Sequence, residues 1–197
     1  MILFALGALI VGVLCAQFWF SPELCEALNP FSDVMLAILI FSVGIDIGQT
    51  REVFKGLRRI GFRALLIPAA EIVGTLIPGT LAGMALGFPM NVSAGISAGF
   101  GWYSLSAVML TDLVSPQVGT IAFLSNIFRE IIAIILIPLL AKYVGKYTAI
   151  APAGATSMDT TLSIVKKYTS DEVAVVSILN GVLLTALVPV LVTVFCG

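Results

Sequence analysis

Long apolar runs separated by short polar turns dominate this chain. Five of them are continuous enough to form single membrane-crossing helices, at residues 2–20, 31–48, 62–86, 118–140 and 173–195. A crossing helix needs about 20 mostly apolar residues, and each run is close to that length. The pattern therefore predicts an all-α polytopic membrane protein with about five transmembrane helices, organised as one transmembrane domain over residues 1–197.

Two further apolar segments, residues 92–113 and 148–165, are interrupted by glycine, proline and hydroxyl side chains. The interruptions read Gly99-Phe-Gly-Trp-Tyr-Ser-Leu-Ser106 and Ala151-Pro-Ala-Gly-Ala-Thr-Ser-Met-Asp-Thr-Thr-Leu-Ser163. Irregular backbone at membrane depth is tolerated only where it is buried in protein or lines a water-filled cavity. We therefore expect the rest of the chain to bring these two segments together.

Positive charge distinguishes two topologies, because lysine and arginine concentrate in cytoplasmic loops. If both broken segments cross, giving seven crossing segments, Lys142 and Lys146 lie outside while Lys166 and Lys167 lie inside. If both are re-entrant hairpins that enter from opposite faces, all four share the cytoplasmic side with the basic loop at residues 51–63. The charges favour five spans plus two opposed re-entrant segments, with a cytoplasmic N-terminus and an external C-terminus.

A weak internal repeat runs through residues 92–197, after three scaffold spans in residues 1–91. The first series comprises residues 101–106, Asn126 and Pro138, and the second comprises residues 153–159, Asn180 and Pro189. In the five-span topology the two units have opposite orientations, as in secondary transporters whose sites lie between broken helices. Chance similarity between apolar segments is the alternative explanation.

Composition narrows the function further. Hydrophobic residues make up 59% of the chain and charged residues 11%, against about a quarter charged in soluble domains. The net charge of −1 indicates no nucleic-acid partner. There is no histidine, and Cys15, Cys25 and Cys196 lack metal-ligand spacing. With no nucleophile–base pair either, the sequence predicts a lipid-embedded protein that is not an enzyme and holds no metal or cofactor.

Asp159 is the carboxylate of the second interruption. Acids inside a membrane are costly and are usually functional, so we expect Asp159 to bind a cationic group beside Thr156 and Ser157. The spacing from Thr156 to Asp159 also matches a capping box, with Thr156 capping a helix over residues 157–167. The two interpretations agree for cation binding. They conflict for proton carriage, because the helix dipole would stabilise the charged carboxylate.

The first interruption combines small residues, hydroxyl groups and aromatic rings. Its candidate binding residues are Gly99, Gly101, Trp102, Tyr103, Ser104 and Ser106. Backbone N–H groups freed by the glycines, with the serine hydroxyls, would cradle a carboxylate, and the aromatic rings would face a cation. The alternative is close helix packing by the small residues and an interfacial belt for the rings.

Asn126, Arg129 and Glu130 share one helix face because they lie at positions i, i+3 and i+4. Arg129 either forms a structural ion pair with Glu130 or Glu71, or holds an anionic substrate group and resets Glu130 during transport. Asp46 is a further acid near the end of the second span, where pairing with the basic loop is the alternative. Glu130 and Asp46 are the candidates for proton coupling.

Four motifs along the chain are similar to those of a known family. They are Phe41-Ser-Val-Gly-Ile45, residues 99–106, Phe128-Arg-Glu-Ile-Ile-Ala133 with Ile137-Pro138, and Gly154-Ala-Thr-Ser-Met-Asp159. In order and spacing they resemble the signatures of the LysO-type L-lysine exporter family, and the resemblance runs through nearly all of the chain.

The resemblance implies a bacterial inner-membrane antiporter that exports L-lysine and cationic lysine analogues against protons, by alternating access. Single-chain members of that family carry an additional N-terminal part. This chain therefore resembles the C-terminal half of a split exporter, which implies a small separate membrane protein as partner. Asp159 and Asp46 would then hold the ammonium groups of lysine, and the first interruption with Arg129 its carboxylate. An organic-anion carrier and a holin-like or scaffold subunit are the alternative functions.

Overall fold

The computed structural model describes residues 65–197 continuously, together with isolated positions between residues 7 and 45. The chain divides into two compact units, Met1–Ser42 and Val43–Gly197. Every described position from residue 7 to 18 and from 31 to 45 is helical, within the first two predicted spans. Asp46 and the basic loop lie outside the described residues. Both broken segments, and the helices that flank them, lie within residues 65–197.

Three long helices frame this part of the chain. They are α4 (Leu66–Ala85), α7 (Pro116–Tyr143) and α9 (Asp171–Cys196), and each is long and apolar enough to cross a membrane. The side chains of Ser115 and Ser170 accept hydrogen bonds from backbone N–H groups in the first turns of α7 and α9, as N-caps do. These helices match the last three predicted spans and confirm a helical membrane protein.

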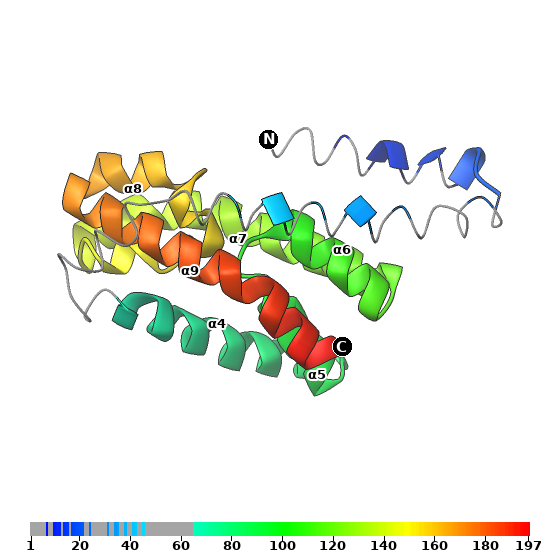
Figure 1. Cartoon of the computed structure of the whole chain (residues 1–197). Coiled ribbons are helices and arrows are strands. Elements are labelled where there is room, and N and C mark those ends of the chain that lie inside the picture. Colours follow the sequence, from blue (N-terminus) through cyan, green and yellow to red (C-terminus); the bar gives the residue numbers. More distant parts are fainter. Residues whose placement is uncertain are drawn as a thin grey trace. The chain divides into compact units, whose positions relative to one another are not determined.

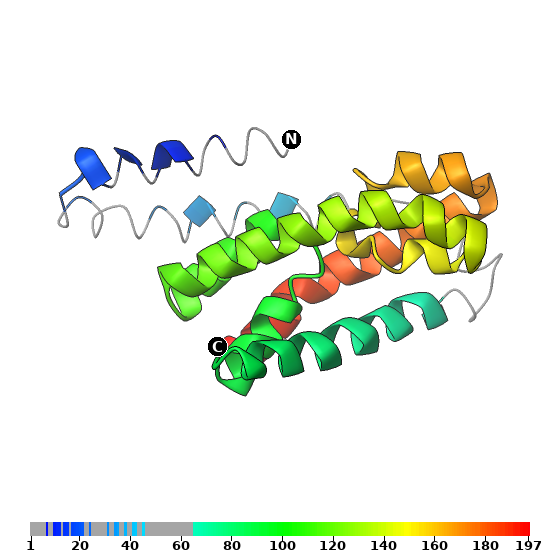
Figure 2. The same cartoon turned by 180° about the vertical axis from the view of Figure 1, so that it is seen from behind.

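The first broken segment is a helical hairpin. It consists of α5 (Met90–Ser97), an irregular loop at residues 98–102, and α6 (Tyr103–Leu113). In both views α5 starts beside the end of α4, and α6 ends beside the start of α7 (Figures 1 and 2). The segment therefore returns to the end of the helix bundle from which it entered.

Contacts between small residues fix the direction of this hairpin. Gly83 of α4 lies against Ser93 of α5, and Gly79 lies against Ser97, so α5 runs antiparallel to α4. A short turn at residues 114–115 then joins α6 to α7. Close approach at small residues is how helices pack in membranes, where the lipid is as apolar as the side chains.

The second broken segment enters from the opposite end of the same helices. It contains two 3₁₀ turns, η2 (Thr148–Ile150) and η3 (Gly154–Met158), followed by α8 (Leu162–Tyr168). Because α7 ends and α9 begins at that end, this segment also returns to where it entered (Figures 1 and 2). In the described residues the arrangement agrees with two opposed hairpins rather than with seven crossing segments.

The capping-box interpretation of Thr156 is wrong. Its hydroxyl donates backward to the carbonyl oxygen of Ala153 at 2.7 Å, and residues Gly154–Met158 form a 3₁₀ turn instead of the first turn of an α-helix. The helix begins only at Leu162. Just before it, the hydroxyl of Thr161 donates a hydrogen bond to the carbonyl oxygen of Thr156 at 2.9 Å. Asp159 therefore does not lie in the first turn of α8.

An apolar core holds the second segment between α7 and α9. Its buried members are Ala133, Ile137, Ala149, Ile150, Ala153, Val165, Val173 and Val176. The core joins residues from α7, η2, α8 and α9, so the segment is packed on several sides before it reaches the middle of the helices.

The hairpin topology predicts which positions share a membrane face. In a background without the three native cysteines, Lys142→Cys and Lys166→Cys should react with a membrane-impermeant maleimide from the same side. Gln117→Cys, at the other end of α7, should react from the opposite side. Reaction of the variants at 142 and 166 from opposite sides would show that the second segment crosses the membrane.

Candidate functional site

The tips of the two hairpins meet beside the middle of α7. The backbone N–H of Ala155 donates to the carbonyl oxygen of Phe100 at 2.8 Å, which joins the second tip to the first. Gly154 has a φ of 65°, and a Cβ built on it would overlap that same carbonyl oxygen. Glycine is needed here both for its left-handed conformation and for this close approach.

Asn126 of α7 holds the first tip. Its side-chain oxygen accepts a hydrogen bond from the N–H of Gly101 at 2.6 Å, and its amide nitrogen donates to the hydroxyl of Ser106 at 3.2 Å. Ser106 in turn donates to the carbonyl oxygen of Trp102 at 2.8 Å. Asn126, Gly101 and Ser106 are all buried, so these bonds fix the loop inside the protein.

Asn180 of α9 holds the second tip. Its amide nitrogen lies 3.2 Å from the hydroxyl of Ser157, 3.4 Å from the carbonyl oxygen of Gly154 and 2.9 Å from Glu71 Oε2. Ser157 and Ser177 also exchange hydrogen bonds, each hydroxyl donating to the other residue's carbonyl oxygen at 2.9 and 2.7 Å. All five residues are buried.

The two asparagines occupy corresponding places. Asn126 bonds a glycine and a serine of the segment before its helix, and so does Asn180. Each therefore follows its broken segment by a similar length of chain and contacts its tip in a similar way. This correspondence supports the internal repeat predicted from the sequence.

Arg129 forms an ion pair with Glu71 of α4. The distance from Arg129 Nη2 to Glu71 Oε1 is 2.6 Å, and Arg129 Nη1 donates to the hydroxyl of Thr75 at 3.1 Å. The guanidinium carbon also lies 6.0 Å from the centre of the Phe100 ring. Of the two partners expected for a structural pair, Glu71 is the one that the structure provides. Arg129 thus links α4 to α7 and touches the first tip.

Glu130 is buried beside the junction. Neither of its carboxylate oxygens makes a hydrogen bond of normal geometry among the described residues, but the side chain of Thr160 lies close enough to interact with it. Its exposed fraction is 1%, and it lies within electrostatic range of Tyr103 and Asp159, one from each broken segment. A buried polar group without a partner costs roughly 1–3 kcal/mol. Two further atoms at the junction share this condition, Arg129 Nε and Asn180 Oδ1. The centre therefore holds unused acceptors and a donor.

Asp159 lies at the exposed edge of the second segment. Its Oδ1 accepts hydrogen bonds from Thr160, at 2.5 Å from the backbone nitrogen and 3.3 Å from the hydroxyl. Ser104, at the start of α6, is likewise exposed. These two are the predicted binding residues whose side chains lie most open at the junction, and the structure leaves their substrate-binding role as a prediction.

The N–H groups of Gly99 and Trp102 in the first interruption have partners within the protein. Gly99 donates to the carbonyl oxygen of Ile96 at 3.3 Å, and Trp102 donates to that of Gly99 at 2.7 Å. Trp102 and Tyr103 are half-buried, and the Tyr103 ring packs edge-on against Phe123 with 5.6 Å between ring centres. Binding a substrate carboxylate at these two N–H groups would require their hydrogen bonds to open.

The structure adds Glu71 and Asn180 to the residues predicted for the site. Both carried a signal in the sequence. Glu71 is an acid inside a span, which is a functional candidate by default. Asn180 is the counterpart of Asn126 in the internal repeat. Asp46, the remaining candidate, lies outside the described residues.

The Glu71–Arg129 pair gives a stability prediction. Glu71→Leu alone should destabilise the protein by about 3 kcal/mol, because it leaves a largely buried arginine unpaired. The double variant Glu71→Leu/Arg129→Met should recover most of that loss in thermal unfolding of the detergent-solubilised protein. Asp171→Asn removes an exposed partner of Lys166 and should change the melting temperature little. A double variant no more stable than Glu71→Leu would contradict the pairing.

Comparison with known proteins gives one family. The family model described as lysine exporter LysO matches residues 6–196. The chain is 35% identical to Lysine exporter LysO of Escherichia coli K12 over 164 residues, covering 83% of this chain and 54% of that protein. It is 34% identical to a putative lysine exporter of Haemophilus influenzae over 190 residues, covering 96% of this chain and 95% of that one.

The chain thus spans about half the length of the first relative and nearly all of the second. No solved structure matches it. The match over residues 6–196, with two relatives above 30% identity, shows that this chain belongs to the lysine exporter LysO family.

Proposed function

We propose that this chain exports L-lysine and cationic lysine analogues across the bacterial inner membrane, in exchange for protons. The observation that carries the proposal is the family match over residues 6–196, together with the relatives' names, lysine exporter and putative lysine exporter. This family is one of transporters rather than enzymes. The helical membrane fold and the polar junction at its centre are consistent with such a role.

The two hairpins would provide alternating access. One enters from each end of the bundle, and their tips meet at the hydrogen bond between Ala155 and Phe100. Sites in transporters with inverted repeats lie near the midplane, between broken helices of opposite orientation. Separating either tip from the junction would open the site to one side of the membrane while the other tip keeps it closed.

The residues at the junction divide into two groups with different roles. Asp159, beside Thr156, would attract an ammonium group, and Ser104 at the start of α6 would receive the substrate carboxylate. Glu130 is the candidate for proton coupling, because it is a buried acid that lies near Tyr103 of the first broken segment and Asp159 of the second. Asp46 remains a second candidate for that role.

The other predicted site residues would act by positioning the tips. Asn126 and Ser157 are already engaged with the loops that they support. Arg129 is paired with Glu71, which weakens its assignment to an anionic substrate group and with it the organic-anion alternative. Substrate contacts by Arg129 would require that pair to rearrange during transport.

A second membrane protein completes the proposal. The chain covers 54% of the Escherichia coli relative, so a small partner would supply the remaining part in a split exporter. The Haemophilus influenzae relative has nearly the same extent as this chain. The partner would be encoded in the same genome and would co-purify with this chain.

Lysine efflux from the source bacterium tests the function with any native partner present. Cells lacking this chain should retain preloaded radiolabelled lysine, and wild-type chain should restore efflux. Asp159→Asn should lower the efflux rate at least about tenfold, as for loss of a charge-assisted hydrogen bond. Glu130→Gln should remove the dependence of efflux on an imposed pH gradient.

Asp171→Asn is the matched control, since Asp171 is an exposed acid outside the junction. It should leave efflux unchanged. Equal lysine efflux with and without the wild-type chain would refute the export function. Normal efflux by Asp159→Asn would refute only the role of Asp159.

A further inference from the structure

An open cavity of about 380 Å³ lies beside α4, and Asp159 is not among the described residues that line it. Its volume falls within the range of roughly 300–1,000 Å³ that is typical of small-molecule sites. The lining residues come from the first turns of α4 and from the chain around η2. They are Leu66, Ile67, Ala70, Glu71, Gly74, Thr75, Tyr147, Thr148 and Ala151.

The cavity wall has the chemistry of a site for a cation with an apolar stem. Among the described residues of the lining Glu71 is the charged one, and Thr75, Tyr147 and Thr148 add hydroxyl groups. The other lining residues are apolar or glycine. A lysine side chain has four methylene groups and a terminal ammonium with three donors, so both of its parts find complementary surface here.

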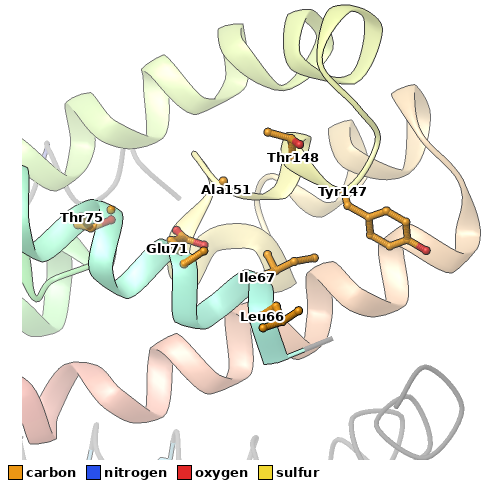
Figure 3. Close-up of a pocket in the computed structure, with 9 residues that line it drawn as sticks. Leu66, Ile67, Glu71, Thr75, Tyr147, Thr148 and Ala151 are labelled. Carbon is orange, nitrogen blue, oxygen red and sulfur yellow. The ribbon is translucent and has the colours of Figure 1, made fainter. Parts of the chain in front are cut away.

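Glu71 has acceptor capacity left for such a donor. Its Oε1 contacts Arg129 and its Oε2 contacts Asn180, and the backbone of Gly154 also lies within hydrogen-bonding range of the carboxylate. A carboxylate offers about four lone-pair positions, so one remains. The side chain is only 1% exposed, so water screens its charge little. Figure 3 shows Glu71 projecting from α4 toward the segment that carries Thr148 and Ala151.

The cavity also lies at the end of the bundle where the lysines gather. Its lining comes from the start of α4 and from the chain just after α7, the end that also carries Lys142, Lys146 and Lys166. The positive-inside rule assigns that end to the cytoplasm, from which an exported substrate must come. Glu71 also contacts Asn180, which holds the second tip, so a cation bound in the cavity would lie next to that tip.

We propose that this cavity is the cytoplasmic loading site for the substrate. Glu71 receives the terminal ammonium of a lysine-like cation, and Leu66, Ile67 and Ala70 cover its stem. The bound ammonium shares Glu71 with Arg129, whose other contacts are Thr75 and the Phe100 ring. The proposal rests on the function proposed above and assigns it a first binding step.

Gly74 allows the cavity to be filled without disturbing the ion pair. It lines the cavity, and a Cβ built on it meets nothing within 4 Å. Gly74→Leu should therefore fold normally but raise the KM for lysine efflux at least about tenfold, the effect of losing one charge-assisted contact. Gly74→Ala, which adds only a methyl group in the same place, should raise the KM less than Gly74→Leu does.

A labelling experiment tests recognition of the ammonium directly. In the purified protein without its native cysteines, Gly74→Cys should react with a methanethiosulfonate reagent more slowly when L-lysine is present. Norleucine, which has an uncharged side chain of similar length, should not protect. Lys142→Cys is the control, because Lys142 is exposed at the end of α7 and lies outside the cavity lining, so lysine should not change its reaction rate.

The outcomes separate this inference from the proposed function. If Gly74→Leu exports lysine with the same KM as the wild-type chain, the loading site is wrong, and the export function still stands. Equal protection by norleucine and lysine would overturn ammonium recognition by Glu71. Absence of lysine efflux by the wild-type chain in its source bacterium would overturn both proposals.

Discussion

Irregular backbone in the middle of an apolar bundle must find its hydrogen-bond partners inside the protein, because lipid offers none. In this chain the requirement is met where the two hairpin tips touch. The N–H of Ala155 bonds the carbonyl oxygen of Phe100, and Asn126 and Asn180 satisfy groups on either side of that contact. The irregular backbone of the two tips thus lies at the junction, where its polar groups have partners, and the long helices beside it cross as regular helices.

The junction also joins polar side chains from three helices. Glu71 of α4 contacts Arg129 of α7 and Asn180 of α9, so one carboxylate ties all three long helices near the tips. A cation that approaches Glu71 acts on the same carboxylate that holds Arg129 against the first tip and Asn180 against the second. This arrangement gives a physical basis for coupling substrate binding to tip movement without a separate relay.

Much of the architecture could be predicted from the sequence because it depends on apolar run length and on local breaks. The spans that became α4, α7 and α9 follow from the lengths of their runs. The positions of Lys142 and Lys166 predicted the hairpin form of the second segment. The repeat pairs Asn126 with Asn180, and each of them contacts a glycine and a serine of the segment before its helix.

The parts that could not be predicted depend on tertiary contacts. The spacing of Thr156 and Asp159 suggests a cap, but residues Gly154–Met158 form a 3₁₀ turn that bonds Phe100 of the first tip, and α8 begins only at Leu162. The partner of Arg129 was ambiguous because sequence cannot show that α4 brings Glu71 within 2.6 Å.

The N–H of Gly101 looked available for a ligand. Only packing against α7 shows that Asn126 accepts its hydrogen bond. In each of these cases the local sequence allowed more than one arrangement, and a residue distant in the chain selected one.

The contact between the tips is the central claim, and Gly154→Ala tests it most directly. A methyl group there would overlap the carbonyl oxygen of Phe100 and force a left-handed conformation that costs roughly 1–2 kcal/mol. Thermal unfolding should show a marked loss of stability for Gly154→Ala and none for Gly74→Ala, where the added methyl group meets open space. Equal melting temperatures for Gly154→Ala and the wild-type protein would contradict the account, because tips that meet as described leave no room for that methyl group.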